Sequence, residues 1–332
     1  MNSATSPPTS GHGAAQPAAA VNFALAERAK YEALCLQQPD RFSYLTLDAT
    51  LPGYQVYLVE QWALDRQRFC KSVAVFTGDQ QHQVKVCVGR TQLGEDYERL
   101  CVQSSDQEIF RTKETSLGRF AFAINVNRLN TALNLLPVPD GDVDAAFGRF
   151  GLNVNLRRFG CSGRGALSLK MPSEAIEDSF EYLYHVADSI SVYYAVWELG
   201  RLVQMSLYLL GLTSIYYVDG LICDTTLAAA RQFSVEYGIH ERESGDGPLN
   251  PSIVARLLSK IVSARNKLYL LGYQVGKDPF DDPAALLQGV SAFQKATDST
   301  LTGRLDRSTC RLLDNAFLQR GTQTLKVHRV RG

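Results

Sequence analysis

The feature that most constrains the fold of this chain is a change of sequence pattern near residue 172. Between residues 51 and about 170, short segments rich in β-branched and aromatic residues alternate with turn residues, as in GYQVYLVEQWA and GRFAFAINV. After residue 172, apolar residues recur at helical spacing instead. Because strands come first and helices follow, the sequence predicts the α+β class, with a mixed N-terminal domain and an all-α domain after it.

Domain limits follow from the same pattern. The first twenty residues are rich in Ser, Pro, Ala and Gly, which is typical of a disordered tail. A short helix is expected over residues 22–38. The α+β domain also contains the predicted helices EDYERLCVQ and AAFGRFGLNVNLRRFG and the predicted strand GALSLK. We therefore expect a tail with a short helix over 1–38, an α+β domain over 39–171, a helical domain over 172–320 and a tail over 321–332.

Charge and composition exclude several classes of function. The chain has 34 Lys plus Arg and 34 Asp plus Glu, so its zero net charge gives no electrostatic basis for direct binding of nucleic acid or of an anionic membrane. The most membrane-like stretch, 192–218, contains Glu198 and Arg201, which favours a buried amphipathic helix over a membrane span. No signal peptide is visible, so a nuclear and/or cytoplasmic rather than a secreted protein is expected.

Cysteine and histidine usage predicts neither disulfides nor a metal. The seven cysteines are scattered and form no CxxC pair, which fits free thiols in a reducing compartment. The five histidines show no ligand spacing, so no zinc site and no cofactor are expected.

A short phrase occurs twice in the helical part, as GPLNPSIVARLL from Gly247 and as GRLDRSTCRLL from Gly303. Asn250 and Asp306 are good helix N-caps, because their side chains accept a hydrogen bond from the first turn. The glycines permit the tight turns that lead in. An amphipathic helix precedes each phrase, so we predict two related units at about 219–272 and 273–320.

The second unit resembles the peptidoglycan-binding-like fold. The matching residues are Phe293, Gln294, Gly303, Leu305, Asp306 and Thr309. The earlier copy matches less well, with Gln232 and Phe233 in reversed order. The resemblance implies a groove between helices, so one alternative function is a peptide- or glycan-binding module with an aromatic groove near Phe233 or Phe293. The other reading of the repeat is a packing or protein-contact unit.

A wider resemblance covers residues 40 to 318. The segments that carry it are GYQVYLVEQWA, FTGDQQHQV, SLGRFAFAIN, PVPDGDV, NVNLRRFGCSGR, VDGLICDTT, SARNKLYLLG and KDPFDD. In this order they resemble the N-terminal domain of the fungal Sin3-binding (STB-type) proteins. The resemblance implies a non-enzymatic scaffold or adaptor in transcriptional regulation. Its implied partner is the Sin3 co-repressor scaffold of histone deacetylase complexes.

Two loops carry the remaining candidate chemistry. GCSGRG, at 160–165, lacks the lysine of a phosphate-binding loop and is interpreted as a glycine turn. Arg157, Arg158 and Arg164 around it are candidates for an anion or partner contact, and a second alternative function is an enzyme that uses this loop, with Cys161 or Ser162 as nucleophile. PVPDGDV places Asp140 and Asp142 two residues apart, in a rigid turn or an exposed recognition loop.

Trp62 is expected to be structural, within the apolar run YLVEQWA. Glu60 beside it is expected to lie in a strand and to pair with Arg66 or Arg68.

Overall fold

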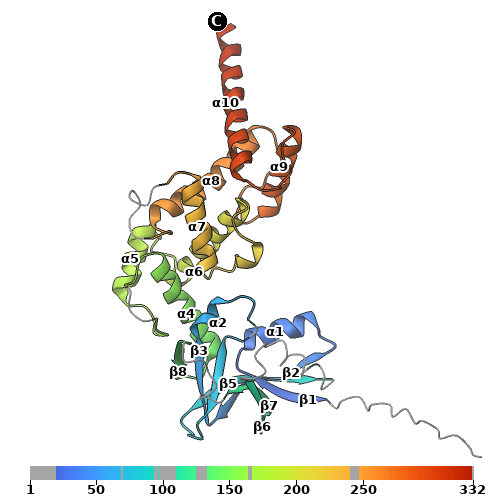
Figure 1. Cartoon of the computed structure of the whole chain (residues 1–332), viewed down its shortest axis with the longest axis vertical. Helices are drawn as coiled ribbons and strands as arrows, with labels where there is room; N and C mark the ends of the chain where they lie inside the picture. Colours follow the sequence, from blue (N-terminus) through green and yellow to red (C-terminus); the bar gives the residue numbers. More distant parts are fainter. Residues whose placement is uncertain are drawn as a thin grey trace, which may run out of the picture. The chain divides into compact units, whose positions relative to one another are not determined.

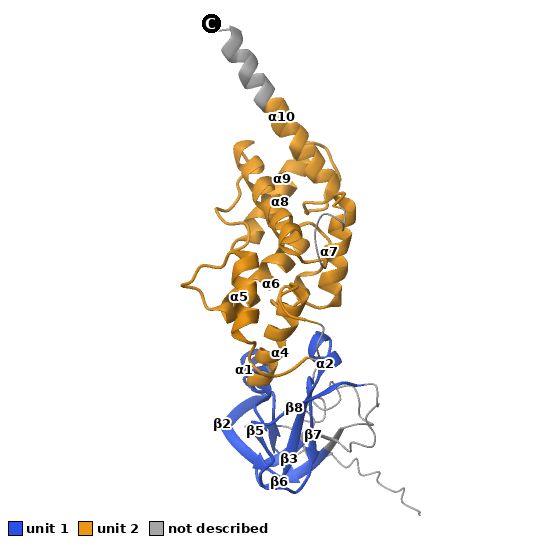
Figure 2. Cartoon of the chain, turned by 90° about the vertical axis from the view of Figure 1, so that its left-hand side faces the viewer, with its two compact units in different colours: residues 1–144 blue, residues 145–332 orange. Residues whose placement is uncertain are grey.

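The computed structural model describes residues 20–68, 70–92, 96, 110–124, 133–163, 167–239 and 247–330. The chain divides into two compact units, residues 1–144 and 145–332, which Figure 2 shows in separate colours. The first unit is rich in strands and the second is helical (Figure 1). The predicted α+β class is therefore confirmed.

A single mixed sheet forms the frame of the first unit. Its strands are β1 (Val21–Leu25), β2 (Phe42–Pro52), β3 (Tyr54–Val59), β4 (Ser72–Phe76), β5 (Gln83–Thr91), β6 (Phe110–Thr115), β7 (Gly118–Ile124) and β8 (Leu135–Val138). They lie in the order β2-β5-β1-β7-β4-β3-β8, and β6 pairs with β7. β7 is parallel to β1 and β4, whereas the other pairs are antiparallel. Strand β1, the first strand among the described residues, therefore lies inside the sheet, between β5 and β7.

Helix α1 (Arg28–Gln37) packs on this sheet through Tyr31. The Tyr31 ring meets Phe23 of β1 edge to face at 5.3 Å, and its hydroxyl donates to the carbonyl of Ser43 at 2.6 Å. A Cβ atom at Gly89 of β5 would lie 2.2 Å from the Tyr31 hydroxyl oxygen. Glycine at this position therefore allows the close approach of α1 to the sheet.

Trp62 lies in the short helix α2 (Glu60–Leu64) and is buried with Val59 and Val73. The guanidinium of Arg68 lies over its ring, 4.9 Å from the centroid. Glu60 begins this helix rather than lying in a strand, and its carboxylate accepts a hydrogen bond from the side-chain amide of Asn134. Arg68, one of the two arginines expected to pair with Glu60, thus lies over the tryptophan ring.

The second unit is an assembly of helices around one core. Its elements are α4 (Val143–Arg158), α5 (Glu174–Tyr184), α6 (Val192–Leu209), the short 3-10 helix η2 (Ile215–Tyr217), α7 (Asp224–Glu236), α8 (Pro251–Leu270), α9 (Pro283–Ala296) and α10 (Arg307–Val330). One contiguous cluster of buried apolar side chains runs from Leu152 of α4 to Leu313 of α10.

The boundary between the units lies after residue 144, not near 171 as the sequence predicts. The reason is the packing of α4. Leu152, Leu156 and Phe159 are at most 1% exposed and belong to the helical core. The helix AAFGRFGLNVNLRRFG is present as predicted, but it belongs to the helices rather than to the sheet unit.

Several local predictions differ from the structure. Residues 22–25, the start of the helix expected over 22–38, belong to β1 instead, because this strand pairs with β5 and β7. Residues 167–170 of the predicted strand GALSLK are not extended into a sheet. The predicted helix EDYERLCVQ lies outside the described residues, apart from Asp96. Helix α10 continues to Val330, where a tail is expected, since its sequence contains no proline.

Helix α6 holds the stretch that looks most membrane-like. The guanidinium of Arg201 donates to Glu198 at 2.6 Å within this helix, and Gln204 is fully buried. In the part of the chain that the structure describes, no helix is long and apolar enough to cross a membrane.

Candidate functional site

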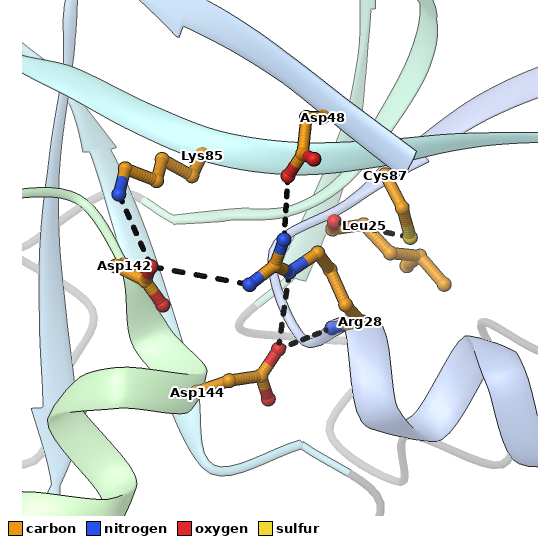
Figure 3. A network of polar contacts seen from close by, with 7 residues as sticks. All are labelled: Leu25, Arg28, Asp48, Lys85, Cys87, Asp142 and Asp144. Carbon is orange, nitrogen blue, oxygen red and sulfur yellow. Dashed lines mark hydrogen bonds and ion pairs between the residues drawn. The ribbon is translucent and has the colours of Figure 1, made fainter. Parts of the chain in front are cut away.

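Arg28, the first residue of α1, is the centre of a polar cluster (Figure 3). Its guanidinium lies 2.5 Å from Asp48 of β2, 3.7 Å from Asp144 and 4.0 Å from Asp142. Its backbone N–H also donates to Asp144 at 2.8 Å. One cation thus joins the start of α1, strand β2 and the segment that leads from β8 into α4. We call Arg28, Asp48, Lys85, Asp142 and Asp144 the Arg28 cluster.

Lys85 of β5 binds the same segment from the other side. Its ammonium lies 3.2 Å from Asp142, and its backbone N–H donates to the carbonyl of Gly141 at 3.0 Å. Gly141 has a φ of 65°, and a Cβ there would lie 2.1 Å from the carbonyl oxygen of Gln83. The PVPDGDV turn therefore fits tightly against β5, and only glycine fits at its tip.

Asp144 sits at the N-terminus of α1 although it is distant in sequence. Burial raises the pKa of its carboxyl, while the N–H groups of Arg28 and Ala29 lower it. A carboxylate near the first N–H groups of a helix is favourable, because those groups have no partner within the helix. The Arg28 cluster is thus an internal clasp of the first unit.

Asp140 and Asp142 have different positions in this clasp. Asp142 faces Arg28 and Lys85, whereas Asp140 accepts a hydrogen bond from the backbone of Asp142 at 3.3 Å and shapes the turn. Their use as a partner contact stays a prediction. Among the described residues, no group of three or more His, Cys, Asp and Glu side chains is placed to hold a metal ion.

Of the three candidate arginines, the structure describes Arg157 and Arg158. Arg158, near the end of α4, donates to the carbonyl of Ile222 at 2.7 Å and to Asp224 at 2.8 Å. It therefore holds the start of α7. Arg157 is exposed, and Arg164 lies outside the described residues. An anion contact at these arginines stays a prediction.

Cys161 lies on the glycine turn after α4. Its thiol is buried, and burial raises its pKa to about 11. A thiol with this pKa is protonated at neutral pH and is a poor nucleophile. Gly160 has a φ of 81°, which fits the expected glycine turn. The geometry gives no support to an enzyme that uses Cys161 as nucleophile.

The two repeated phrases begin helices. Asn250 accepts a hydrogen bond from the N–H of Ile253 at 3.1 Å, and Asp306 accepts one from Thr309 at 2.8 Å. Gly247 and Gly303 both have positive φ, at 112° and 63°. Each phrase is thus a capped helix start.

Phe233 and Phe293 are buried in the helical core, at 2% and 1% exposure. They pack against Tyr237 and Tyr273, with ring centroids 4.8 Å and 5.6 Å apart. The aromatic groove expected beside them is therefore filled by the protein itself.

A buried glutamine holds the turn before α10, a role that the sequence pattern did not identify. Gln294 is fully buried in α9. Its amide oxygen accepts from the N–H of Gly303 at 2.9 Å, and its amide nitrogen donates to the hydroxyl of Thr309 at 2.8 Å and lies 3.2 Å from the carbonyl of Arg304. One side chain thus ties α9 to the turn and to the first turn of α10.

Gln204 of α6 makes the same set of bonds to the turn before α7. Its oxygen accepts from Gly220 at 2.7 Å, and its nitrogen reaches Leu221 at 2.8 Å and Thr226 at 3.5 Å. Each of these turn positions lies 83 residues before its counterpart around Gln294. The structural counterpart of Gly303 is therefore Gly220 rather than Gly247. The signal in the sequence was a glycine followed six residues later by threonine.

Comparison with known proteins finds a matching domain family and similar curated proteins. Residues 21–159 match the family described as STB6-like, N-terminal domain. Protein STB6 of Saccharomyces cerevisiae is 28% identical over 286 residues, which cover 75% of this chain and 37% of that protein. Protein STB2 of the same organism is 29% identical over 287 residues, with 73% and 33% covered.

The similarity is wider than the family domain, since 75% of this chain exceeds residues 21–159 and so includes part of the helical unit. The chain spans about a third of the length of these curated relatives. No solved structure matches it. Residues 21–159 of the chain thus match the STB6-like N-terminal domain, and the chain is similar to STB6 and STB2.

Proposed function

We propose that the protein is a non-enzymatic adaptor that associates with a Sin3-type co-repressor complex in transcriptional regulation. The observation that carries this proposal is the similarity to STB6 and STB2, which extends across both units. The STB-type resemblance of the sequence implies the Sin3 scaffold as partner. Action in the nucleus belongs to the same proposal.

The geometry supports a binding role over a catalytic one. The polar residues of the Arg28 cluster face one another, and Arg158 holds its own chain. The Cys161 thiol is buried and protonated at neutral pH. These groups maintain the fold, and this is compatible with the proposed adaptor role.

The helical unit supports a second, structural part of the proposal. We infer that α5–α7 and α8–α10 are two related three-helix units, because Gln204 and Gln294 bind their turns in the same way. This assignment is compatible with the resemblance to the peptidoglycan-binding-like fold. Since Phe233 and Phe293 are buried, such units serve in packing and in protein contact rather than in binding a glycan beside these rings.

The test is affinity purification of the tagged full chain from its own cells, followed by mass spectrometry. Recovery of Sin3 and histone deacetylase subunits is expected, and their absence would overturn the proposal. Purified full chain and purified Sin3 are then mixed, to separate direct from indirect association. Sequence-specific binding of duplex DNA by the purified chain at physiological salt would contradict an adaptor that makes no direct DNA contact.

A further inference from the structure

An open groove of about 560 Å³ lies on the helical unit, between α8 and α10. Leu258, Val262, Asn266 and Leu270 of α8 line one side, and Phe317 of α10 lies on the other. Val262 is 41% exposed and Leu270 is 53% exposed, although both are apolar. Exposed apolar residues gathered in a groove mark a contact surface more often than the same residues scattered singly.

The shape of the groove suits a helix. The lining residues of α8 are four apart and form one row on its surface. The twelve residue steps of α-helix from Leu258 to Leu270 span about 18 Å, which equals roughly three turns of a partner helix. A bilayer would require an apolar surface that protrudes, whereas this one is recessed.

The two helices that border the groove carry mostly basic charge. Helix α8 contains Arg256, Lys260, Arg265 and Lys267 and has no acidic residue. Between residues 307 and 320, α10 has three arginines and one acidic residue, Asp314. Asp314 already binds Lys267 at 2.6 Å and lies 3.6 Å from Lys260. Lys267 lines the groove, and Arg320 donates to the carbonyl of Leu270 at its end.

We propose that this groove binds an acidic amphipathic helix of a partner protein. Apolar side chains of the partner helix, spaced three and four apart, enter the groove between Val262, Leu270 and Phe317. Its Asp and Glu residues flank that apolar face and meet the positive potential of α8 and α10, which steers association and selects against basic partners. This proposal does not depend on Sin3 being the partner.

The test uses a synthetic helical peptide of about 18 residues, with leucines on one face and glutamates on both flanks. Its binding to the full chain is measured by fluorescence anisotropy at low and high salt. We expect saturable binding that weakens with salt. A peptide with lysine in place of every glutamate is expected to bind at least about tenfold more weakly. Equal binding of the two peptides would overturn the proposal.

Substitutions in the chain locate the binding surface. Val262→Glu and Leu270→Glu are each expected to weaken binding of the acidic peptide about tenfold or more, because they place charge in the apolar groove. Val235→Glu is the matched control, since Val235 is an 80% exposed valine of α7 outside the groove. Circular dichroism checks that every variant is folded. Unchanged binding by both groove variants would exclude this site.

Other occupants give different results. If the groove joins two copies of the chain, sedimentation will show a dimer that Val262→Glu dissociates, and the acidic peptide will not bind. If it binds lipid, vesicles of phosphatidylserine and phosphatidylcholine will retain the chain but not Val262→Glu, again without peptide binding. Either result would overturn the proposal while leaving the Sin3 association untouched.

Discussion

At the scale of single residues, Arg28 makes contacts that sequence reasoning did not foresee. Its three aspartate partners are 20, 114 and 116 residues away in the chain. No local pattern encodes such a meeting, because it depends on how β2, β5 and the β8–α4 segment are placed by the sheet. The sequence pattern identified Asp142 as part of a turn, but it did not identify Lys85 and Arg28, which face it.

Replacing Arg28 by alanine tests the clasp. We expect Arg28→Ala to lower the free energy of unfolding by about 2 kcal/mol, since it leaves Asp142 and Asp144 without this cation in a partly buried site. Urea unfolding followed by circular dichroism measures the change. The control is Glu114→Gln, which removes an exposed ion pair to Arg119 and is expected to cost less than about 0.5 kcal/mol. Equal losses in the two variants would show that the Arg28 cluster stabilises the fold no more than an exposed ion pair does.

Cys161 gives a prediction for alkaline pH. Burial raises its folded pKa from 9.0 to about 11, so the folded state favours the protonated thiol. Its stabilising contribution is therefore complete below pH 9 and is lost as the pH rises toward 11. Urea unfolding at several pH values should show a steeper loss of stability over this range in the natural chain than in Cys161→Ala. Parallel pH profiles would disprove this assignment.

At the scale of elements, sequence patterns correctly predicted the features that depend only on residues adjacent in the chain. The N-caps Asn250 and Asp306 lie where the polar side chain and the following residues specify a helix start. Residues 22–25 were predicted as the start of a helix over 22–38, because their strand state depends on partners in β5 and β7. The likeness of the two glutamine turns was missed because their loops differ in length, with 16 residues from Gln204 to Gly220 and nine from Gln294 to Gly303.

Substitution of Gln204 and Gln294 tests how much their hydrogen bonds to the two turns stabilise the chain. Gln294→Leu and Gln204→Leu each remove bonds to a buried turn and are expected to destabilise the chain by about 2–4 kcal/mol, because backbone groups lose their partner inside the protein. Thermal or urea unfolding measures the loss. Gln232→Leu, in exposed α7 sequence where the glutamine contacts Glu236, should change stability by less than about 0.5 kcal/mol. If all three variants behave alike, the buried bonds do not stabilise the turns.

At the scale of the whole molecule, the division after residue 144 makes a prediction about fragments. Residues 145–332 retain α4 and are expected to unfold cooperatively as a helical unit. Residues 172–332, cut where the sequence alone places the boundary, lose Leu152, Leu156 and Phe159 from the core. We expect this shorter fragment to bind a hydrophobic dye and to melt without a sharp transition. Equal melting curves would show that α4 is dispensable.

The position of β1 inside the sheet has a consequence for the nascent chain. Phe23 and Ala24 lie beside Arg119 and Phe120, which the ribosome adds almost a hundred residues later. Strand β1 therefore lacks both neighbours until β5 (Gln83–Thr91) has been added, and lacks β7 until Gly118–Ile124 have been added. Because pairing between distant strands is slow and leaves apolar edges open, we expect β1 to be exposed to wrong pairing while this unit is being synthesised.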